Sequence, residues 1–565
     1  MPRPWLAHYA DGVPADVDLP TESLYTPLEV AAARFGDRVA LDFFGAATSY
    51  AELEDGVARA AHALRELGVR PGDRVALVLP NCPQHVVAFY AVLRLGAIVV
   101  EHNPLSTAAE FAQQFADHGA EVAVCWDRAV PAVVEAGGAG ALRTVVAVNL
   151  TAALPRRSRW ALRLPVPRAR SLRASMTGPV PAGTLSWERL VGAAPRLDPD
   201  VPRPGPDDVA ALQYTGGTTG PPKGAVLSHR NLRVNAVQGR AWLPGLVDGE
   251  ETVYGVLPLF HSYGLTLCLS FTVSIAATLV LFPRFDVDAV LSAARRRPAT
   301  FLPGVPPVYE QLATAARERG VDLRSIRYAI SGAMSLPPAT VALWEEVTGG
   351  LLVEGYGMTE ASPVVLGNPI SPARRPGTVG VPFPSTVMRI VDPDDPTVDR
   401  PPGDPGELLV RGPQVFDGYW NQPEETAAVL LPGGWLRTGD IVIADEDGCV
   451  RIVDRLKELI ITGGFNVYPS EVEDVLRRLD GIADAAVVGL PRPDGGERVT
   501  AAVVLAEGAS LNEDRVRAHC RTYLAGYKVP REVVAVAELP RSMIGKVLRR
   551  EVRATLLGTT PAAVR

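Results

Sequence analysis

Short apolar runs alternate with helical patterns along the first half of the chain. The runs at 73–80 (DRVALVLP), 97–103 (AIVVEHN) and 121–126 (EVAVCW) predict strands, and helices are predicted at 86–95 and from residue 107. Strands separated by helical segments form βαβ units, in which the strands are parallel and helices cover both faces. The pattern therefore predicts an α/β fold built on parallel sheets.

The segment 263–282 (YGLTLCLSFTVSIAATLVLF) is long enough to span a bilayer, and no Asp, Glu, Lys or Arg occurs from 252 to 283. It contains Gly264 together with several threonines and serines, and it ends in a run rich in β-branched residues. This order is typical of a buried helix followed by a buried parallel strand. We therefore interpret the segment as core rather than as a membrane span.

The βαβ pattern resumes at residue 209 and continues to about residue 445. A turn-rich stretch at 445–455 then leads to a smaller unit with a helix at 470–479, strands at 485–490 and 498–505, and a second helix at 513–524. A chain of 565 residues exceeds the size of one hydrophobic core. We expect a large N-terminal domain of parallel-sheet βαβ subdomains at 1–453 and a smaller, mobile α+β domain at 454–565, joined by a short hinge.

The composition, with 47% apolar and 21% charged residues, is that of a globular protein. A net charge of −7 gives no overall basic field, so no nucleic-acid partner is expected. The five cysteines are widely spaced and form no Cys-x-x-Cys pair, which argues against a disulfide framework and a zinc site. The first residues lack the apolar region of a secretory signal, and a cytoplasmic location is expected.

One segment interrupts the pattern. Residues 156–173 contain seven arginines and no acidic residue, interleaved with Trp160 and three leucines. Two interpretations are open: a solvated loop or insertion, and a basic surface with apolar side chains that lies on anionic lipid at the inner membrane face. Pro165 and Pro167 argue against one continuous amphipathic helix.

Lysine is scarce in this chain. Of 56 basic residues only four are lysines, namely Lys223, Lys457, Lys528 and Lys546. A lysine ammonium is a compact point charge on a flexible stem, which reaches a phosphate or a developing oxyanion where a planar guanidinium does not fit. The four lysines are therefore candidates for specific chemistry, although no chemical role is assigned to Lys528.

The segment 214–224 (YTGGTTGPPKG) follows an apolar strand and has the composition of a polyphosphate-binding loop. Its glycines free backbone N–H groups to point inward, its threonines add hydroxyl donors, and its lysine supplies a positive charge. It differs from a Walker loop, because the lysine lies between Pro222 and Gly224. The candidate phosphate-binding residues are Thr215, Gly216, Gly217, Thr218, Thr219, Gly220 and Lys223.

With this loop the chain resembles the adenylate-forming superfamily of acyl-CoA synthetases, luciferase-like enzymes and peptide-synthetase adenylation domains. The resemblance covers nearly the whole chain and is greatest to bacterial long- and medium-chain fatty-acid CoA ligases. Two positions depart from commoner versions of the motifs: Gly217, where serine is frequent, and Gly355. The further segments that match in the correct order are 257–265, 331–338, 354–363, 406–426, 434–441, 453–473 and 539–550.

The resemblance implies an ATP-dependent ligase that forms an acyl-adenylate from a fatty acid and then transfers the acyl group to coenzyme A. ATP, Mg²⁺ and CoA are the implied ligands. Two related alternatives stay open, a fatty acyl-AMP ligase that loads a carrier protein and an aryl-acid CoA ligase. A third, a membrane-associated fatty-acid-binding protein without catalysis, is disfavoured because the motif residues are complete.

The resemblance also implies roles for individual residues. Glu360, with Thr215, would hold Mg²⁺, and Asp440 would bind the ribose hydroxyls. Lys546 would stabilise the charge that develops as the carboxylate attacks the α-phosphate, with Lys457, Thr215 and Lys223 as further catalytic residues. The remaining nucleotide residues are Gly332, Ala333, Gly355, Tyr356, Gly357, Thr359 and the hinge residues Arg455 and Lys457.

The acyl group and CoA have their own expected residues. His261 lies at the mouth of the expected acyl pocket, and Gly264 and Gly355 leave room for the substrate. Gly463, Gly464 and Phe465 would approach the pantetheine arm of CoA.

Overall fold

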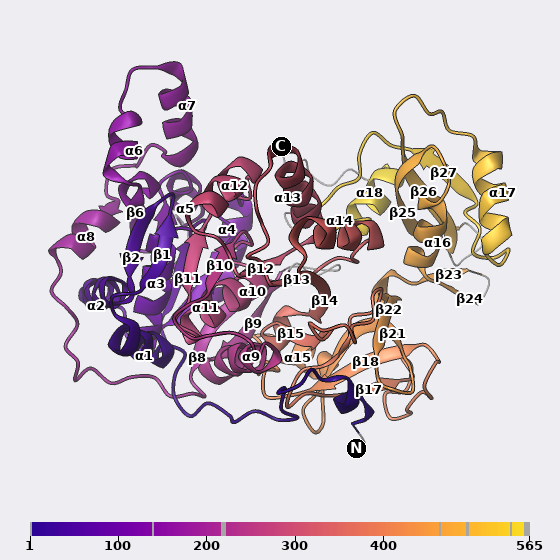
Figure 1. Ribbon diagram of the computed structural model, residues 1–565, viewed down its shortest axis with the longest axis horizontal. Helices are drawn as coiled ribbons and strands as arrows, with labels where there is room; N and C mark the ends of the chain where they lie inside the picture. Colours follow the sequence, from indigo (N-terminus) through magenta and orange to yellow (C-terminus); the bar gives the residue numbers. More distant parts are fainter. Residues whose placement is uncertain are drawn as a thin grey trace. The chain divides into compact units, whose positions relative to one another are not determined.

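The structure is a computed structural model that describes residues 3–137, 140–215, 222–462, 465–492, 497–542 and 545–558 (Figure 1). The chain forms two compact units. The larger unit contains Leu6–Val387 and Arg411–Leu436, and the smaller contains Met388–Val410 and Arg437–Arg565 together with Met1–Trp5. The domain boundary between residues 453 and 454 stays a prediction.

A nine-stranded sheet forms one part of the larger unit. Its central strands run parallel, while β2 pairs antiparallel with β1 at one edge and β15 and β16 pair antiparallel at the other. The strand order is β16 (Val381–Pro382), β15 (Val364–Gly367), β14 (Leu351–Gly357), β13 (Tyr328–Ser331), β12 (Phe301–Gly304), β10 (Thr252–Gly255), β11 (Thr278–Leu281), β1 (Val39–Phe43) and β2 (Ala46–Ser49).

An eight-stranded sheet forms the other part of the larger unit. It is parallel except for β9, which pairs antiparallel with β8 and with β19. The strand order is β19 (Gly418–Tyr419), β9 (Lys223–Ser228), β8 (Val209–Thr215), β4 (Ile98–Glu101), β3 (Arg74–Val78), β5 (Val122–Trp126), β6 (Thr144–Val148) and β7 (Leu185–Ser186).

Helices connect these strands, as the βαβ pattern predicts, and local sequence fixes their ends. Ser49 and Thr107 begin their helices with capping boxes. Each hydroxyl accepts the backbone N–H of the glutamate three residues later, and the glutamate carboxylate accepts the backbone N–H of the capping residue. The principal helices are α1 (Thr26–Phe35), α2 (Tyr50–Glu66), α3 (Pro83–Arg94), α4 (Ala108–His118), α5 (Val130–Gly137), α8 (Trp187–Ala193), α9 (His229–Trp242), α12 (Val287–Arg296), α13 (Pro306–Arg319), α14 (Pro338–Thr348) and α15 (Pro423–Val429).

The long apolar segment 263–282 is core, as expected. It forms α10 (Ser262–Gly264), the π-helix η3 (Leu265–Ser270) and α11 (Phe271–Ser274), and then β11. All four residues of β11 are buried, and the strand lies parallel between β1 and β10. Among the described residues, no helix combines the length and the apolar character that crossing a membrane requires.

The arginine-rich segment contains two short helices, α6 (Arg156–Ala161) and α7 (Pro167–Met176). The residues between them, including Pro165, are not helical. The proline pair therefore ends one helix and begins the next, because Pro167 takes the first helical position, where it needs no N–H.

A five-stranded sheet contains β17 (Val387–Val391), β18 (Gly406–Arg411), β21 (Trp435–Ala444) and β20 (Leu430–Leu431), with β22 (Val450–Arg455) paired to β21. The stretch 445–455 was expected to be turn-rich throughout, but only its first residues turn. Val450 to Arg455 form a strand, because they pair antiparallel with Asp440 to Ala444 across the hairpin.

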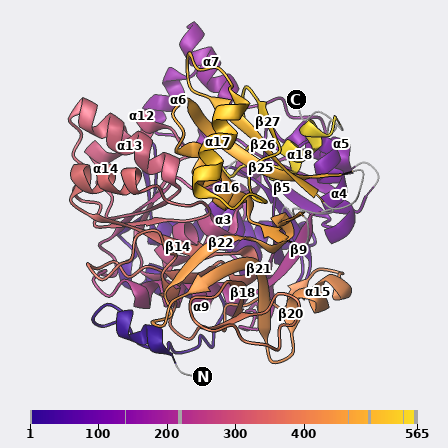
Figure 2. The ribbon, with the colours of Figure 1, turned by 90° about the vertical axis from the view of Figure 1, so that its right-hand side faces the viewer.

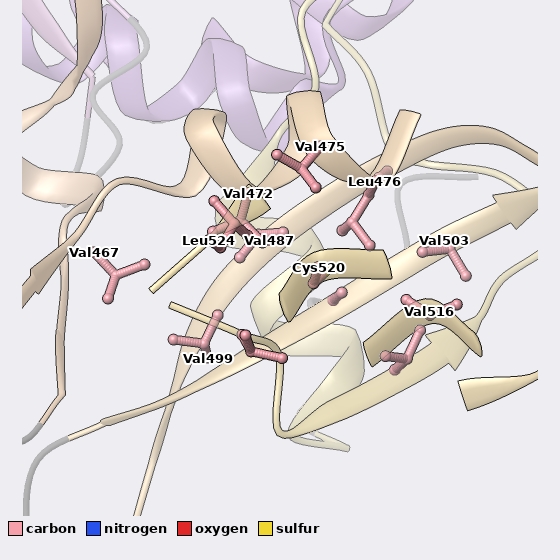
Figure 3. Close-up of a cluster of buried hydrophobic side chains, with 14 of the residues drawn as sticks. Val467, Val472, Val475, Leu476, Val487, Val499, Val503, Val516, Cys520 and Leu524 are labelled. Carbon is pink, nitrogen blue, oxygen red and sulfur yellow. The ribbon is translucent and has the colours of Figure 1, made fainter. Parts of the chain in front are cut away.

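The C-terminal part of the smaller unit has the expected α+β fold, in which β25 and β26 pair antiparallel and β26 and β27 pair parallel. Its core is an apolar cluster between α16, α17 and the sheet, with Val472, Leu476, Val487, Val503 and Cys520 buried (Figure 3). The elements are η5 (Leu456–Glu458), β23 (Ile460–Thr462), β24 (Phe465–Val467), α16 (Pro469–Arg477), β25 (Ile482–Pro491), β26 (Glu497–Leu505), α17 (Glu513–Tyr523), β27 (Glu532–Ala535) and α18 (Arg549–Leu556).

Candidate active site

The two strands that flank the predicted phosphate loop hold its ends together. Thr215, the last residue of β8, pairs with Lys223, the first residue of β9, and its hydroxyl donates to the Lys223 carbonyl at 3.4 Å. The antiparallel pairing thus places the candidate hydroxyl and ammonium groups at the base of one loop. The predicted loop residues Gly216, Gly217, Thr218, Thr219 and Gly220 lie outside the described residues.

The ammonium of Lys223 lies between an acid and an aromatic ring. It forms an ion pair with Glu425 of α15 and lies 5.2 Å from the centre of the Tyr419 ring. The Lys223 side chain is only 14% exposed, so its positive charge is held in a confined place. A carboxylate partner shows that the position accepts an anionic oxygen, which is the chemistry of a phosphate contact.

Glu360 is the candidate Mg²⁺ ligand and lies in η4 (Thr359–Ala361), where it is buried. The Tyr419 hydroxyl donates to its Oε1 at 2.7 Å. Burial and the nearby Glu360 raise the pKa of Tyr419 well above its ordinary value, so the phenol keeps its proton. Among the described residues Glu360 Oε2 has no hydrogen-bond partner, and a carboxylate oxygen of this kind fits Mg²⁺.

Sequence reasoning missed Tyr419, although it lies within the motif segment 406–426. It contacts both Lys223 and Glu360, which the sequence separates by more than 130 residues. No local pattern marks this tyrosine, because its position depends on β19, a two-residue edge strand that pairs with β9 far away in the sequence.

The predicted adenine-binding residues meet at the ends of two neighbouring strands. Ser331 of β13 is in register with Glu354 of β14, which brings Gly332 and Ala333 alongside Gly355 and Tyr356. A Cβ on Gly332 would lie 3.1 Å from the Tyr263 ring. Close packing therefore favours a small residue at this position, and the parallel pairing places the four predicted residues next to one another.

A side chain is excluded at Gly357 for a different reason, which is the backbone that lies against it. A Cβ at this position would lie 2.1 Å from the Pro363 carbonyl oxygen, a distance that no side chain tolerates. Next to it, the hydroxyl of Thr359 lies 3.2 Å from that of Ser262. The segment that contains Glu360 is thus packed against the segment that contains His261.

His261 is the N-cap of α10, and its Nδ1 accepts the Tyr263 N–H at 3.3 Å. Burial lowers its pKa, so the neutral ring is favoured. Gly264 packs against backbone, since a Cβ would lie 2.1 Å from the Pro258 carbonyl oxygen. The role of both residues at the acyl group stays a prediction.

A small apolar cavity of about 20 Å³ lies in the larger unit between α9, the apolar helices η3 and α11, and strands β12 to β15. Gly355 forms part of its wall, whereas His261 and Gly264 do not. The other lining residues are Gly239, Trp242, Leu243, Leu267, Phe271, Phe301, Ile330, Val353, Glu354, Val364, Gly367, Asn368 and Phe383.

Most atoms that line the pocket are hydrocarbon, and the one ionisable side chain is buried. Glu354 accepts the N–H groups of Leu336 at 3.3 Å and Gly377 at 3.1 Å. Burial raises its pKa to about 7. The lining is apolar, as an alkyl chain requires, and it offers no free acid to pair an α-ammonium group.

The smaller unit collects the candidate ribose and adenylation residues. Asp440 of β21 is in register with Arg455 of β22, and its Oδ1 lies 3.0 Å from the Arg455 Nε. Burial first, and then the charge of Arg455, lowers the pKa of Lys546. Lys546, Asp440 and Arg455 therefore share one electrostatic environment, and their roles in nucleotide binding stay a prediction.

Arg549 was missed by sequence reasoning and joins three acids. It forms ion pairs with Asp454, Glu458 and Glu473, and its side chain is 16% exposed. Asp454 and Glu458 flank the predicted hinge residue Lys457, which is itself exposed. Arg549 thus links both sides of the hinge to the segment that contains Lys546.

The predicted CoA residues are only partly described. Gly463 and Gly464 lie outside the described residues, and Phe465 begins β24. Their role stays a prediction, as do the individual roles of the nucleotide, metal and acyl residues.

Residues 28–420 match the AMP-binding enzyme family, and residues 471–546 match the AMP-binding enzyme C-terminal domain. The chain belongs to the AMP-binding enzyme family. Adenylate-forming members of this family activate acids as adenylates, in agreement with the motifs and their order. The α/β fold with a large parallel-sheet part and a smaller C-terminal domain is confirmed.

The chain is 38% identical to a long-chain-fatty-acid–CoA ligase of Bacillus subtilis (strain 168), covering 97% of each chain. It is 39% identical to a feruloyl-CoA synthase of Amycolatopsis sp., covering 90% of this chain and 94% of the other. The ATP-bound structure of MatB from Rhodopseudomonas palustris has a TM-score of 0.81 and 31% identity, covering 95% of this chain and 99% of the other.

Proposed function

We propose that this AMP-binding enzyme is a fatty acid CoA ligase, which converts a medium- or long-chain fatty acid, ATP and CoA into acyl-CoA, AMP and pyrophosphate. The observation that carries the proposal is the apolar pocket that includes Gly355, the residue next to Tyr356 of the proposed adenine slot. Each methylene buried in such a pocket contributes about 0.8 kcal/mol, so affinity should grow with chain length. The full-length similarity to a long-chain-fatty-acid–CoA ligase supports the same substrate class.

In the first half-reaction a fatty carboxylate oxygen attacks the α-phosphorus of ATP, and pyrophosphate leaves. Lys223 and the 216–220 loop hold the phosphates, while Lys546 stabilises the negative charge that grows during attack. Glu360 and Thr215 would hold Mg²⁺, which would supply positive charge to the phosphate oxygens. The adenine lies among Gly332, Ala333, Gly355, Tyr356, Gly357 and Thr359, and Asp440 accepts the ribose hydroxyls.

In the second half-reaction the CoA thiol attacks the acyl carbonyl of the adenylate, and AMP leaves. We propose that the C-terminal domain turns about the hinge at Arg455 and Lys457, which withdraws Lys546 and brings Gly463, Gly464 and Phe465 to the pantetheine arm. The adenylate is already activated, so no nucleophile from the protein is required.

An aryl-acid CoA ligase is the second candidate, because the chain is 39% identical to a feruloyl-CoA synthase. The polar Glu354 and Asn368 in the pocket lining would then contact substituents on a ring. The fatty-acid proposal is favoured by the apolar character of the lining and by the full-length similarity to a long-chain-fatty-acid–CoA ligase.

One assay separates these candidates. CoA-dependent AMP production is measured with acetate, octanoate, dodecanoate, palmitate, benzoate, 4-coumarate and phenylalanine, each with and without CoA. We expect kcat/KM to rise with alkyl chain length and to be low for acetate and phenylalanine. A highest kcat/KM for an aromatic acid would replace the fatty-acid assignment with the second candidate.

We also propose a cytoplasmic location with peripheral contact at the inner membrane face. Long-chain fatty acids partition into bilayers, so a ligase that acts on them gains from proximity to lipid. Salt-sensitive membrane association of the full chain in fractionated cells tests this location.

A further inference from the structure

The helices α6 and α7 form a hairpin at the periphery of the larger unit, which both views show (Figures 1 and 2). We call residues 156–176 the arginine hairpin. Its base is fixed, since the Trp126 indole N–H donates to the Met176 carbonyl at 2.8 Å and Arg128 donates to the Ser175 carbonyl at 3.0 Å. The hairpin is therefore an ordered projection on the body of the larger unit.

The arginine hairpin presents unpaired positive charge. All seven of its arginines are exposed, and none forms an ion pair with any residue that the structure describes. Several exposed arginines elsewhere on the same unit are paired, such as Arg196 with Glu54 and Asp55, and Arg203 with Glu29. No acidic residue occurs between 136 and 187, so the local charge is positive although the whole chain carries −7.

The same hairpin exposes large apolar side chains. Trp160 is 70% exposed, Leu164 55% and Leu172 52%, whereas Leu162 and Ala169 are buried. The Arg163 guanidinium lies 5.5 Å from the centre of the Trp160 indole ring. More than half of each of these apolar side chains is in contact with water, so a partner that covers them is expected to gain free energy from burying that area.

We propose that the arginine hairpin is a docking surface for a membrane that contains anionic phospholipid. Guanidinium groups bind phosphate through paired, charge-assisted hydrogen bonds, and indole and leucine side chains enter the region between headgroups and acyl chains. The combination of basic and apolar groups on one surface is what an anionic bilayer complements. Nucleic acid would instead need several aromatic rings for base stacking, and Trp160 is the single aromatic residue of the hairpin.

Docking at this surface would hold the enzyme where its fatty-acid substrate is dissolved, and this advantage rests on the proposed function. The binding itself does not, because it requires neither ATP nor a functional active site. A failure of lipid binding and a failure of ligase activity are therefore separate results.

The experiment is vesicle flotation of the full chain with phosphatidylcholine vesicles, with and without phosphatidylglycerol. One variant changes four exposed arginines of the hairpin to glutamine, and a second carries Trp160→Ser and Leu172→Ser. A matched control changes four exposed arginines elsewhere, so its net charge equals that of the first variant. The first variant is Arg157→Gln, Arg159→Gln, Arg168→Gln and Arg170→Gln, and the control is Arg38→Gln, Arg295→Gln, Arg478→Gln and Arg521→Gln.

We expect the unchanged protein and the control to bind only vesicles that contain phosphatidylglycerol, and the hairpin arginine variant to bind them on the order of 1,000-fold more weakly. Binding should be lost at 1 M salt, where the Debye length is roughly 3 Å. The serine variant should lose part of the binding at low salt. Activity on octanoate without vesicles should be the same in all proteins, which shows that each one folds.

Two results would overturn the proposal. One is equal binding of the arginine variant and its control to the anionic vesicles. The other is that the unchanged protein binds immobilised heparin but not vesicles, and that the arginine variant no longer binds heparin. This result would assign the surface to an acidic macromolecule instead.

Discussion

A glycine in the pocket wall allows the proposed acyl pocket to be shortened without harm to the fold. Gly239 lies in α9 and is buried, and a Cβ there would lie 3.4 Å from the Phe271 Cδ2. This contact is only slightly closer than the best carbon–carbon distance, so Gly239→Ala is accommodated. Alanine also stabilises a helix interior by about 1 kcal/mol relative to glycine.

The magnitude follows from the space that the added carbons take. If the methyl group of Gly239→Ala displaces one methylene of the substrate, about 0.8 kcal/mol is lost, which is roughly a fourfold decrease in kcat/KM. Gly239→Val displaces up to three methylenes, or about 2.4 kcal/mol, which is roughly 60-fold. We expect these decreases for palmitate and a smaller change for octanoate, whose chain ends earlier.

The assay is CoA-dependent AMP production at several concentrations of palmitate and of octanoate, with the KM for ATP measured in parallel. Gly192→Ala is the matched control, because Gly192 lies in helix α8 and no atom lies within 4 Å of its added Cβ. The control should leave the palmitate-to-octanoate ratio of kcat/KM unchanged. Equal decreases for both acids in Gly239→Val, or no decrease for either, would refute the role of this pocket.

Three further predictions concern other parts of the site. Lys546→Ala should abolish adenylate formation but leave conversion of synthetic acyl-AMP to acyl-CoA largely intact; loss of both reactions would contradict the division of roles. Tyr419→Phe removes the hydroxyl that donates to Glu360 and should lower stability by about 1.5 to 3 kcal/mol and raise the Mg²⁺ concentration for half-maximal adenylation; an unchanged Mg²⁺ titration would remove this pair from the metal site. Burial raises the pKa of Glu354 from 4.5 to about 7, so its favourable contribution to stability is complete below pH 4.5 and is lost as the pH rises to about 7. The free energy of unfolding, measured with denaturant, should therefore fall by about 3 kcal/mol over that interval in the unchanged protein but not in Glu354→Gln. The same pH profile in both proteins would contradict this.

The pattern of apolar and polar residues was enough to predict the fold class, because the alternation of apolar runs with helical patterns is a local property of the sequence. Residues 73–126 contain the predicted strands and helices in order, and the 263–282 segment is core as its β-branched end indicates. Proline positions alone predicted the break between α6 and α7. The strand β22 was not recognised, since its pairing with β21 depends on a hairpin rather than on its own pattern.

The sequence by itself determined the kind of chemistry, because a phosphate loop and its companion motifs require particular residue types at short spacing. Only the tertiary structure decided which side chains meet: Tyr419 between Lys223 and Glu360, and Arg549 among three acids beside the hinge. It also decided that Gly355 lines an apolar pocket while Gly264 packs against the Pro258 carbonyl. The physical reason is that these contacts join residues far apart in the chain, and their geometry is set by strand register and packing, which no local pattern encodes.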